Sequence, residues 1–418
     1  MSGNDRVHVH TKYTTILVLC LGGVARADDG TTHGPVSAFG EARQSLANSG
    51  VTIEGSLTNF GQGVVSGDGT RDIAWGNRGD LILRFDGGRL GLWEGLSLTL
   101  HQEVVWGNDA NFAGDGSIIP VNTALAFPRI GGDDTNLSLN VTQAFGSQAT
   151  VSLGKFSMLD AASRTPILGG GGLETFMNTA FAAPISGVTP PYILGGIATY
   201  RTAPAVYTLM IYDPRNAADS DVVRDPFETG VTTSLSVTFP TQPRGLSGFY
   251  SIRGVYSTQD GFDLDSIPQL LLPPEAQDIE TKDGYWYASV SMQQYLGQDP
   301  TNPDVGWGVF GQASVSDGNP NPIAWSVIAG IGGRGGLIGD RDDDTWGLGY
   351  FYYGLSENLK AGLDEVGVGL DDEQGIEVFY NLAVTPWLRI TADVQWIDPA
   401  TPTAEDAIIG ALRTQIRF

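Results

Sequence analysis

The sequence predicts an all-β protein, specifically a transmembrane antiparallel up-and-down β-barrel of about 16 strands with short periplasmic turns and long external loops. Three observations lead to this expectation. Gly accounts for 57 of 418 residues, about twice its usual share of roughly 7%. Runs of about ten residues with alternating polarity repeat from residue 51 onwards. After residue 24, no stretch approaches the roughly 20 apolar residues of a membrane-spanning helix.

The N-terminal segment 1–27 is typical of a secretory signal peptide. Its apolar core, "TTILVLCLGGV" (Thr14–Val24), is followed by "ARA" (Ala25–Ala27), which provides the small residues of a cleavage site. Cys20 raises the alternative of a lipid anchor, which the bulky Leu19 before it disfavours. Because Cys20 is the only cysteine, the cleaved chain has none, and a fold held by disulfides is excluded.

Residues 28–50 are expected to form a periplasmic N-terminal segment. Within "GPVSAFGEARQSLANSG" (34–50), apolar and basic side chains recur at the spacing of a helix, and Gly50 is a typical helix stop. The sequence therefore predicts a short periplasmic helix before the first strand. The transmembrane barrel is expected to occupy residues 51–418.

The predicted strands have one polar and one apolar face. In "LRITADVQW" (Leu388–Trp396), Leu, Ile, Ala, Val and Trp alternate with Arg, Thr, Asp and Gln. Segments with this alternation lie near 51–60, 73–86, 96–106, 136–145, 149–156, 195–201, 204–212, 231–239, 247–258, 285–295, 305–316, 323–332, 344–355, 375–384, 387–397 and 409–418.

The connections between these strands alternate in length. Tight turns such as "GSQ" (146–148) and "TP" (385–386) are interspersed with long segments. The long segments lie at 107–135, 157–194, 213–230, 259–284 and 356–374. Short turns at one end and long loops at the other are typical of an outer-membrane barrel. An even number of strands leaves both chain termini on the short-turn side, which faces the periplasm.

The final strand, 409–418, shows how such a wall would be arranged. Ile416 and Phe418 share one face and are predicted to contact lipid, whereas Arg413 and Arg417 share the other and are predicted to face a water-filled lumen. A soluble β-sandwich would show the same alternation with the apolar face buried. The secretory leader, the terminal aromatic residue and the Trp residues near strand ends favour the membrane barrel.

The net charge of −24 limits the partners of this chain. Such a charge disfavours binding to nucleic acids and to anionic lipid surfaces. The acidic residues gather in predicted loops, notably Asp219–Glu228, Asp340–Asp344 and Asp371–Glu373. We expect these segments to be solvated loops, and cation binding by the loops is the alternative.

Catalysis is not expected. After the predicted leader, the only histidines are His33 and His101, and two histidines give little support to a Ser–His–Asp triad or a zinc site. Neither "GGGG" (Gly169–Gly172) nor "GGRGG" is followed by the "GK[ST]" of a phosphate-binding loop. Acidic residues are numerous, but no spacing singles out a pair for glycoside hydrolysis. The sequence therefore predicts no enzyme, no cofactor and no metal site.

Five stretches carry a family resemblance. The two most specific are "DDDTWGLGYFYYGLS" (342–356) and "EQGIEVFYNLAVTPWLRITADVQWIDPA" (373–400). Three weaker ones are "FGEARQSLANSGVTIEGSLTNFGQG" (39–63), "RGDLILRFDGGRLGLWEGLSL" (78–98) and "ETFMNTAF" (174–181). Together they resemble the carbohydrate-selective porin family of Gram-negative bacteria over nearly the whole chain after the leader, although residues 213–284 match poorly.

This resemblance implies a sixteen-stranded barrel in the outer membrane that passes mono- or small oligosaccharides by passive diffusion. It also implies inward-folded loops, chiefly 157–194, that form a constriction, and either a monomer or a homotrimer. Only Arg78, at the start of the "RGD" stretch, aligns with a recurring family position.

A pore for sugars needs hydrogen-bonding groups of both charges at its narrow point, because each sugar hydroxyl both donates and accepts. Strand alternation also places His101 and Arg417 inward. The candidate pore-lining residues, from strand alternation and from the 157–194 loop, are Arg78, Asp80, Arg84, Glu103, Arg164, Glu174, Asn178, Arg253, Glu377, Arg389, Asp393 and Arg413. The alternative is that the strand residues only hydrate the pore and brace its wall, and that the loop rests outside as a surface flap.

The expected function is therefore saccharide-selective passive diffusion through an outer-membrane porin, with sugars as permeant solutes and outer-membrane lipid around the barrel. One alternative is a general or differently selective porin with the same wall. A second, from another class, is an exported soluble β protein that binds or cleaves polysaccharide.

Overall fold

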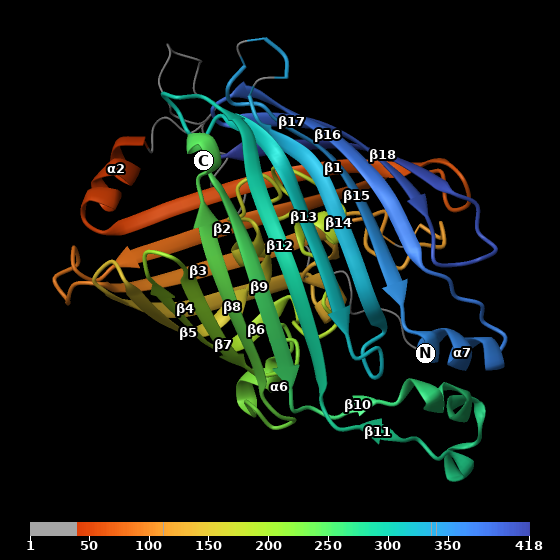
Figure 1. Ribbon diagram of the computed structural model, residues 1–418. Helices are drawn as coiled ribbons and strands as arrows, with labels where there is room; N and C mark the ends of the chain where they lie inside the picture. Colours follow the sequence, from red (N-terminus) through yellow and green to blue (C-terminus); the bar gives the residue numbers. More distant parts are fainter. Residues whose placement is uncertain (1–39, 112, 336, 340) are drawn as a thin grey trace, which may run out of the picture.

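Sixteen antiparallel strands form one closed barrel in the computed structural model, which describes residues 40–418 except 112, 336 and 340 (Figure 1). The predicted signal peptide and the start of the predicted periplasmic segment lie outside the described residues. The barrel strands are β1 (Val51–Ser66), β2 (Ala74–Asp86), β3 (Leu96–Gly107), β4 (Thr135–Phe145), β5 (Ala149–Ser157), β6 (Tyr192–Arg201), β7 (Val206–Tyr212), β8 (Thr232–Thr241), β9 (Gly248–Ser257), β12 (Tyr285–Gln298), β13 (Gly306–Ser316), β14 (Ile323–Arg334), β15 (Thr345–Leu355), β16 (Glu373–Thr385), β17 (Leu388–Asp398) and β18 (Ala407–Arg417).

Each strand pairs with its neighbours in chain order, and β18 pairs with β1, so the predicted up-and-down barrel is confirmed. The closing seam continues to the last residue. The Gly55 N–H donates to the Phe418 carbonyl at 3.0 Å, and the Phe418 N–H donates to the Gly55 carbonyl at 3.0 Å. The closed barrel therefore has no free strand edge, as hydrocarbon surroundings require.

The helices and minor strands all lie in connections or before the first strand. The α-helices are α2 (Gly40–Asn48), α3 (Thr123–Ala126), α4 (Met158–Ala162), α5 (Thr179–Ala182), α6 (Ser220–Arg224) and α7 (Glu357–Glu365). Four 3₁₀ turns and a two-stranded hairpin complete the described chain: η2 (Arg129–Gly131), η3 (Pro243–Gly245), η4 (Leu264–Leu271), η5 (Pro274–Ala276), β10 (Gly261–Phe262) and β11 (Thr281–Lys282). Among the described residues, no helix combines the length and the apolar character needed to cross a bilayer.

The apolar face of the wall points outward. Leu153, Leu235 and Val394 are 62%, 51% and 52% exposed, although each lies in the middle of a strand. Their strand neighbours Ser234 and Asp393 are buried on the inner face. This is the predicted inversion of a soluble fold, in which apolar side chains contact lipid and polar ones line the interior.

The two ends of the barrel differ as predicted. Helix α2 and the C-terminus lie at one end, and α7 and the β10–β11 hairpin lie at the other (Figure 1). The first end has the short turns, such as 146–148 and 386–387, and is the periplasmic end. At that end, Arg43 of α2 donates to the Ile53 carbonyl of β1 at 3.0 Å, which ties the helix to the barrel.

Two long external connections enter the barrel. Residues 108–134 join β3 to β4, and residues 158–191 join β5 to β6. We call them the first and second inward loops, because their backbone and side chains contact the inner face of the wall. The inward positions of β15–β18 and β1–β3 are mostly buried under these loops, whereas many inward positions of β6–β9, β12 and β13 remain partly exposed. The lumen is therefore filled on one side and open along the other.

Asp344 closes the ten-residue periplasmic turn 335–344, and its bonds predict a stability effect. Its buried carboxylate accepts from Arg341 Nε at 2.6 Å, from the Ala383 N–H at 2.8 Å and from the Tyr380 hydroxyl. Burial raises the pKa of Asp344, but these bonds outweigh burial and lower the pKa below its usual value.

A carboxyl with a lowered folded-state pKa stabilises the fold above its unfolded pKa of about 3.9, and this contribution disappears as pH falls through the folded value. We expect Asp344→Asn to cost about 1.5–3 kcal/mol at pH 7 and much less at pH 2. The loss of stability is measured as a lower temperature at which the band of the folded protein on a gel is replaced by that of the unfolded protein. Asp342→Asn, in the same turn, is the control and should not change it; equal losses at both pH values would contradict the assignment.

Candidate functional site

Arg78 on β2 anchors the first inward loop. Its Nη1 donates to the carbonyls of Ala124 at 3.2 Å and Phe127 at 3.0 Å. Its Nε donates to Asp80 at 3.0 Å, and its Nη2 donates to Glu103 at 2.5 Å. The side chain is only 2% exposed. Its guanidinium therefore bonds the loop backbone and two wall carboxylates.

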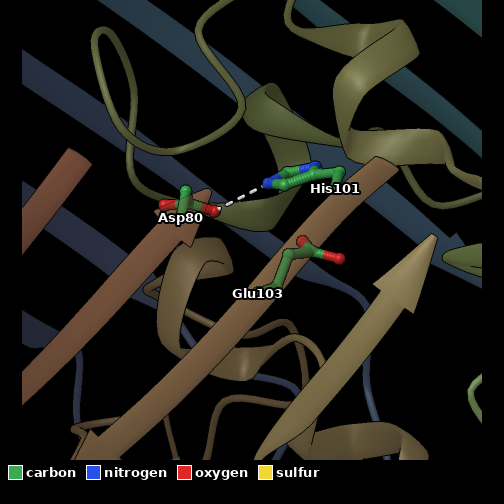
Figure 2. A group of neighbouring side chains, drawn as sticks. All are labelled: Asp80, His101 and Glu103. Carbon is green, nitrogen blue, oxygen red and sulfur yellow. Dashed lines mark hydrogen bonds and ion pairs between the residues drawn. The ribbon is translucent and has the colours of Figure 1, made fainter. Parts of the chain in front are cut away.

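His101 continues this network to the second inward loop. Figure 2 shows Asp80 on β2 directed at His101 on β3, with Glu103 on the same strand as His101. His101 Nε2 lies 3.1 Å from Asp80, and Nδ1 lies 2.9 Å from Asp160 of α4. The three labelled residues offer ligand atoms within 4.8 Å of one another. Because Arg78 pairs with both carboxylates and His101 bonds Asp80 and Asp160, the cluster is an ion network that joins the wall to both loops.

Glu373 on β16, four strands from β2 around the barrel, also holds the first inward loop. Its buried carboxylate accepts from the backbone N–H groups of Ile118 at 2.7 Å and Ile119 at 3.1 Å. It also accepts from the Ala400 N–H at 3.3 Å. The predicted strand at 375–384 begins two residues too late and leaves Glu373 in a loop. Its position four residues before Glu377, on the same strand face, is the signal that identifies it as inward.

The second inward loop has a matching pair of anchors. Arg413 on β18 donates to the carbonyls of Gly172 at 2.7 Å and Thr175 at 2.9 Å. Glu377 on β16 accepts from the backbone N–H groups of Met177 and Asn178. A cation on the wall thus bonds loop carbonyls, and an anion on the wall bonds loop N–H groups, within one short stretch of chain.

Side-chain amides complete this second anchor. Asn178 Nδ2 donates to Gln395 Oε1 at 3.1 Å, and Gln395 Nε2 donates to Asp393 at 3.1 Å and to the Val121 carbonyl at 3.0 Å. Gln395 therefore touches both inward loops. It lies at an inward position of β17, but sequence reasoning selected charged residues and overlooked it.

Aromatic packing seats the second inward loop on the wall. Phe176 stacks on Phe181 with ring centroids 4.6 Å apart, and both rings meet Phe310 of β13 edge-on. Glycines on the inner face of β15 make room for them. A Cβ on Gly347 would lie 2.7 Å from the Phe176 ring, and a Cβ on Gly349 would lie 2.5 Å from the Phe181 ring. Any larger residue at either glycine would displace the loop.

The remaining charged candidates lie near the periplasmic end or on the open side. Arg84 pairs with Glu54 at 2.5 Å, with both side chains nearly half exposed. Glu174 is exposed and its carboxylate lies 2.7 Å from Arg417 Nη2. Arg389 donates to the Asp343 carbonyl at 2.9 Å. These groups surround the periplasmic mouth of the lumen.

Two cavities flank the second inward loop. The β1-side cavity, about 490 Å³, is lined by Arg78, Asp80, His101, Asp160, Glu174 and Arg417 among others. The β12-side cavity, about 410 Å³, lies between the loop and strands β8, β9, β12 and β13. Its lining includes Arg164 and Phe181 of the loop and, on the wall, Thr238, Phe249, Ser251, Ser291 and Gln312.

Arg253 lies on the same wall as the β12-side cavity. Its Nε donates to Ser234 at 3.0 Å, and its Nη2 donates to Thr189 of the second inward loop at 2.8 Å. The twelve candidates therefore fall into three groups. Seven are buried within the loop anchors: Arg78, Asp80, Glu103, Asn178, Glu377, Asp393 and Arg413. Three lie at the periplasmic mouth: Arg84, Glu174 and Arg389. The last two, Arg164 and Arg253, face the open side.

Loss of an anchor should loosen the constriction. We expect Arg413→Met to release the carbonyls of Gly172 and Thr175 and to leave Asp393 and Glu377 without their cation, at a cost of about 3–5 kcal/mol. In planar bilayers the variant should show larger and noisier conductance, and the second inward loop should become sensitive to protease. Arg244→Met, on the exposed periplasmic turn 242–247, is the matched control. Wild-type conductance and protease resistance in a heat-shifting, folded Arg413→Met protein would contradict this role.

Comparisons with known proteins agree with the barrel and with the sequence resemblance. A structure of Pseudomonas putida OprB at high pH superposes with a TM-score of 0.79 at 17% identity, covering 94% of this chain and 100% of that one. The low-pH structure of the same protein gives a TM-score of 0.54 at 14% identity, over the same shares of the two chains. At these identities the likeness supports the fold. A comparison by sequence with curated proteins gives no match.

The family model is decisive, because it matches most of the chain. The model described as "Carbohydrate-selective porin, OprB family" matches residues 91–418, which include β3–β18 and both inward loops. Proteins of this kind are outer-membrane channels and not enzymes. The chain therefore belongs to the OprB family of carbohydrate-selective porins, and its permeant solutes are sugars.

Proposed function

We propose that mono- or small oligosaccharides diffuse passively along the open side of the lumen, through the β12-side cavity. The observation that supports this path is the difference between the two halves of the inner wall. Inward positions of β15–β18 and β1–β3 are largely buried under the inward loops. Inward positions of β6–β9, β12 and β13 are partly exposed, and a cavity lies between them and the second inward loop.

The chemistry of the open wall suits a neutral polyol. Many of its partly exposed inward side chains are hydroxyls or an amide, and they stand beside Ile197, Phe249 and Arg253: Thr199, Thr208, Ser236, Thr238, Ser251, Ser289, Ser291 and Gln312. Pairs of them bond across strands, as Thr238 and Ser251 do at 2.9 Å. Each hydroxyl both donates and accepts, so a sugar can exchange its water for wall contacts at successive steps without an energetic trap.

Arg164 and Phe249 would supply selectivity. Arg164 is exposed on the loop side of the β12-side cavity, and its guanidinium can donate two parallel hydrogen bonds to neighbouring sugar hydroxyls. Phe249 on β9 presents an apolar ring on the wall side, which suits the C–H face of a sugar ring. The buried candidates would act indirectly, by holding the loop that carries Arg164.

We further propose that the barrel functions as a monomer or a homotrimer surrounded by outer-membrane lipid, with a separate sugar path in each barrel. Nucleic acid is not a partner in this proposal. A general diffusion porin remains the alternative for selectivity, because a hydroxyl-lined path also admits other small neutral solutes.

Cysteine accessibility tests the path. The sequence has one cysteine, Cys20, within the predicted signal peptide, so an added thiol is the only one in the cleaved chain. We expect a thiol reagent to modify Ser291→Cys and to reduce glucose flux into proteoliposomes. Ser138→Cys makes the same change at an inward position of β4 that is only 2% exposed, and it should resist modification. If the reagent modified Ser138→Cys and blocked its glucose flux but had no effect on Ser291→Cys, the sugar path would lie on the filled side of the lumen.

Liposome swelling tests selectivity. We expect glucose to enter faster than an amino acid of similar size. Arg164→Gln should raise the glucose concentration at half-saturation by up to about tenfold, since a hydrogen bond to a charged donor is worth about 1.5 kcal/mol or more. Flux of the amino acid should not change. Equal rates for both solutes in the wild-type protein would support general diffusion and reject the saccharide-selective constriction.

A further inference from the structure

A groove runs along the outer face of β5, β6 and β7. Its floor is formed by small residues of β6, and its two sides by larger residues of the neighbouring strands. The register shows the pattern in two successive rows: Leu153, Gly196 and Ile211 pair across the three strands, and Val151, Ala198 and Leu209 pair in the next row. A large–small–large arrangement repeated in adjacent rows produces a channel parallel to the strands.

The groove has a definite size and is covered at its outer end. Its volume is about 540 Å³, and its lining also includes Leu194, Pro226 and Phe227. Pro226 and Phe227 belong to the external connection 213–231 and cover the end nearest the outside. At the periplasmic end, Tyr200 and Tyr207 pair across β6 and β7, and both are exposed. The groove is thus an apolar slot in the outer half of the wall.

The covering residue Phe227 is held in place by an internal network. Its φ of 63° lies in the left-handed region, which a bulky non-Gly residue rarely adopts. The Phe227 N–H donates to Asp213, a fully buried carboxylate that also accepts from Arg215 Nε at 3.0 Å and Nη2 at 2.8 Å. Such a conformation persists only where surrounding contacts enforce it. Phe227 is therefore a built part of the groove and not a chance contact.

We propose that this groove binds one acyl chain of an outer-membrane lipid. The groove opens onto the apolar belt of a barrel that lies in the outer membrane, so its surroundings are hydrocarbon. The backbones of β5 and β7 are about 10 Å apart, two strand spacings, and their side chains narrow the slot further. An α-helix, about 10–12 Å across, does not fit. The convex wall of a second barrel can place only single side chains in the slot, whereas a hydrocarbon chain can lie along its length. A single hydrocarbon chain fits both the width and the apolar lining. This inference rests on the membrane location and not on the sugar path.

Filling the groove is the direct test. In Gly196→Leu, the Cβ would lie 3.0 Å from the flexible end of Leu153 and at an ordinary 3.7 Å from the Ser152 carbonyl oxygen, so the new side chain can occupy the slot without moving backbone. Gly254→Leu is the matched control, because Gly254 is exposed on the outer face of β9 and a Cβ there meets nothing within 4 Å. The gel bands of both variants should shift on heating as the wild-type band does, which shows that both variants fold.

Native mass spectrometry of protein extracted from outer membranes in mild detergent provides the readout. We expect one lipid to remain on the wild type and on Gly254→Leu, and to be lost from Gly196→Leu. The adduct mass distinguishes a phospholipid from a lipopolysaccharide. Retention of the lipid in Gly196→Leu, or its equal loss from both variants, would overturn the proposal. A change of oligomeric state confined to Gly196→Leu would also overturn it and would indicate a second copy of the chain as the occupant. Glucose flux should be unchanged in both variants, so this result is independent of the proposed sugar path.

Discussion

A chain segment that enters a barrel brings backbone N–H and C=O groups with it, and each group buried there needs a partner. This requirement dominates the interior of the protein. Arg78 and Arg413 donate to loop carbonyls, and Glu373 and Glu377 accept from loop N–H groups. The wall therefore carries its charges where the loops need bonds of opposite polarity, and the constriction depends on these four residues for its position.

The same requirement explains why the two halves of the barrel differ in composition. On the filled side, buried charges are paired, as in the network of Arg78, Asp80 and Glu103, or hydrogen-bonded to loop N–H groups, as Glu373 is, because an unpartnered charge beneath a loop would be costly. On the open side, water satisfies polar groups, so neutral hydroxyls suffice there. An acidic protein can consequently present to its solute a surface of mainly neutral side chains with two arginines, Arg164 and Arg253, while most of its acidic residues lie in the loops and in the anchors.

Much of the architecture could be predicted from the sequence, because side-chain alternation is a local property. The number and approximate position of the strands follow from alternation, whereas the direction of Asp393 and Val394 also required the leader, the terminal aromatic residue and the Trp residues near strand ends. The limits of single strands were less accurate: β1 continues to Ser66 instead of ending near residue 60. Alternation could not show whether an inward charge faces water or a loop. That depends on contacts such as Glu377 with Met177, which are 200 residues apart, and no local pattern reports them.

The glycines of β15 and the anchors on β16 and β18 have a consequence for the order of assembly. The second inward loop follows β5, yet Phe181 has its seat on β13 and β15, and Gly172 has its donor on β18. The interior is therefore incomplete until the last strand has been synthesised. Contacts of such sequence separation make folding slow, because much chain entropy is lost before they form. Loop docking and sealing of the cylinder are in this way parts of one late, cooperative event.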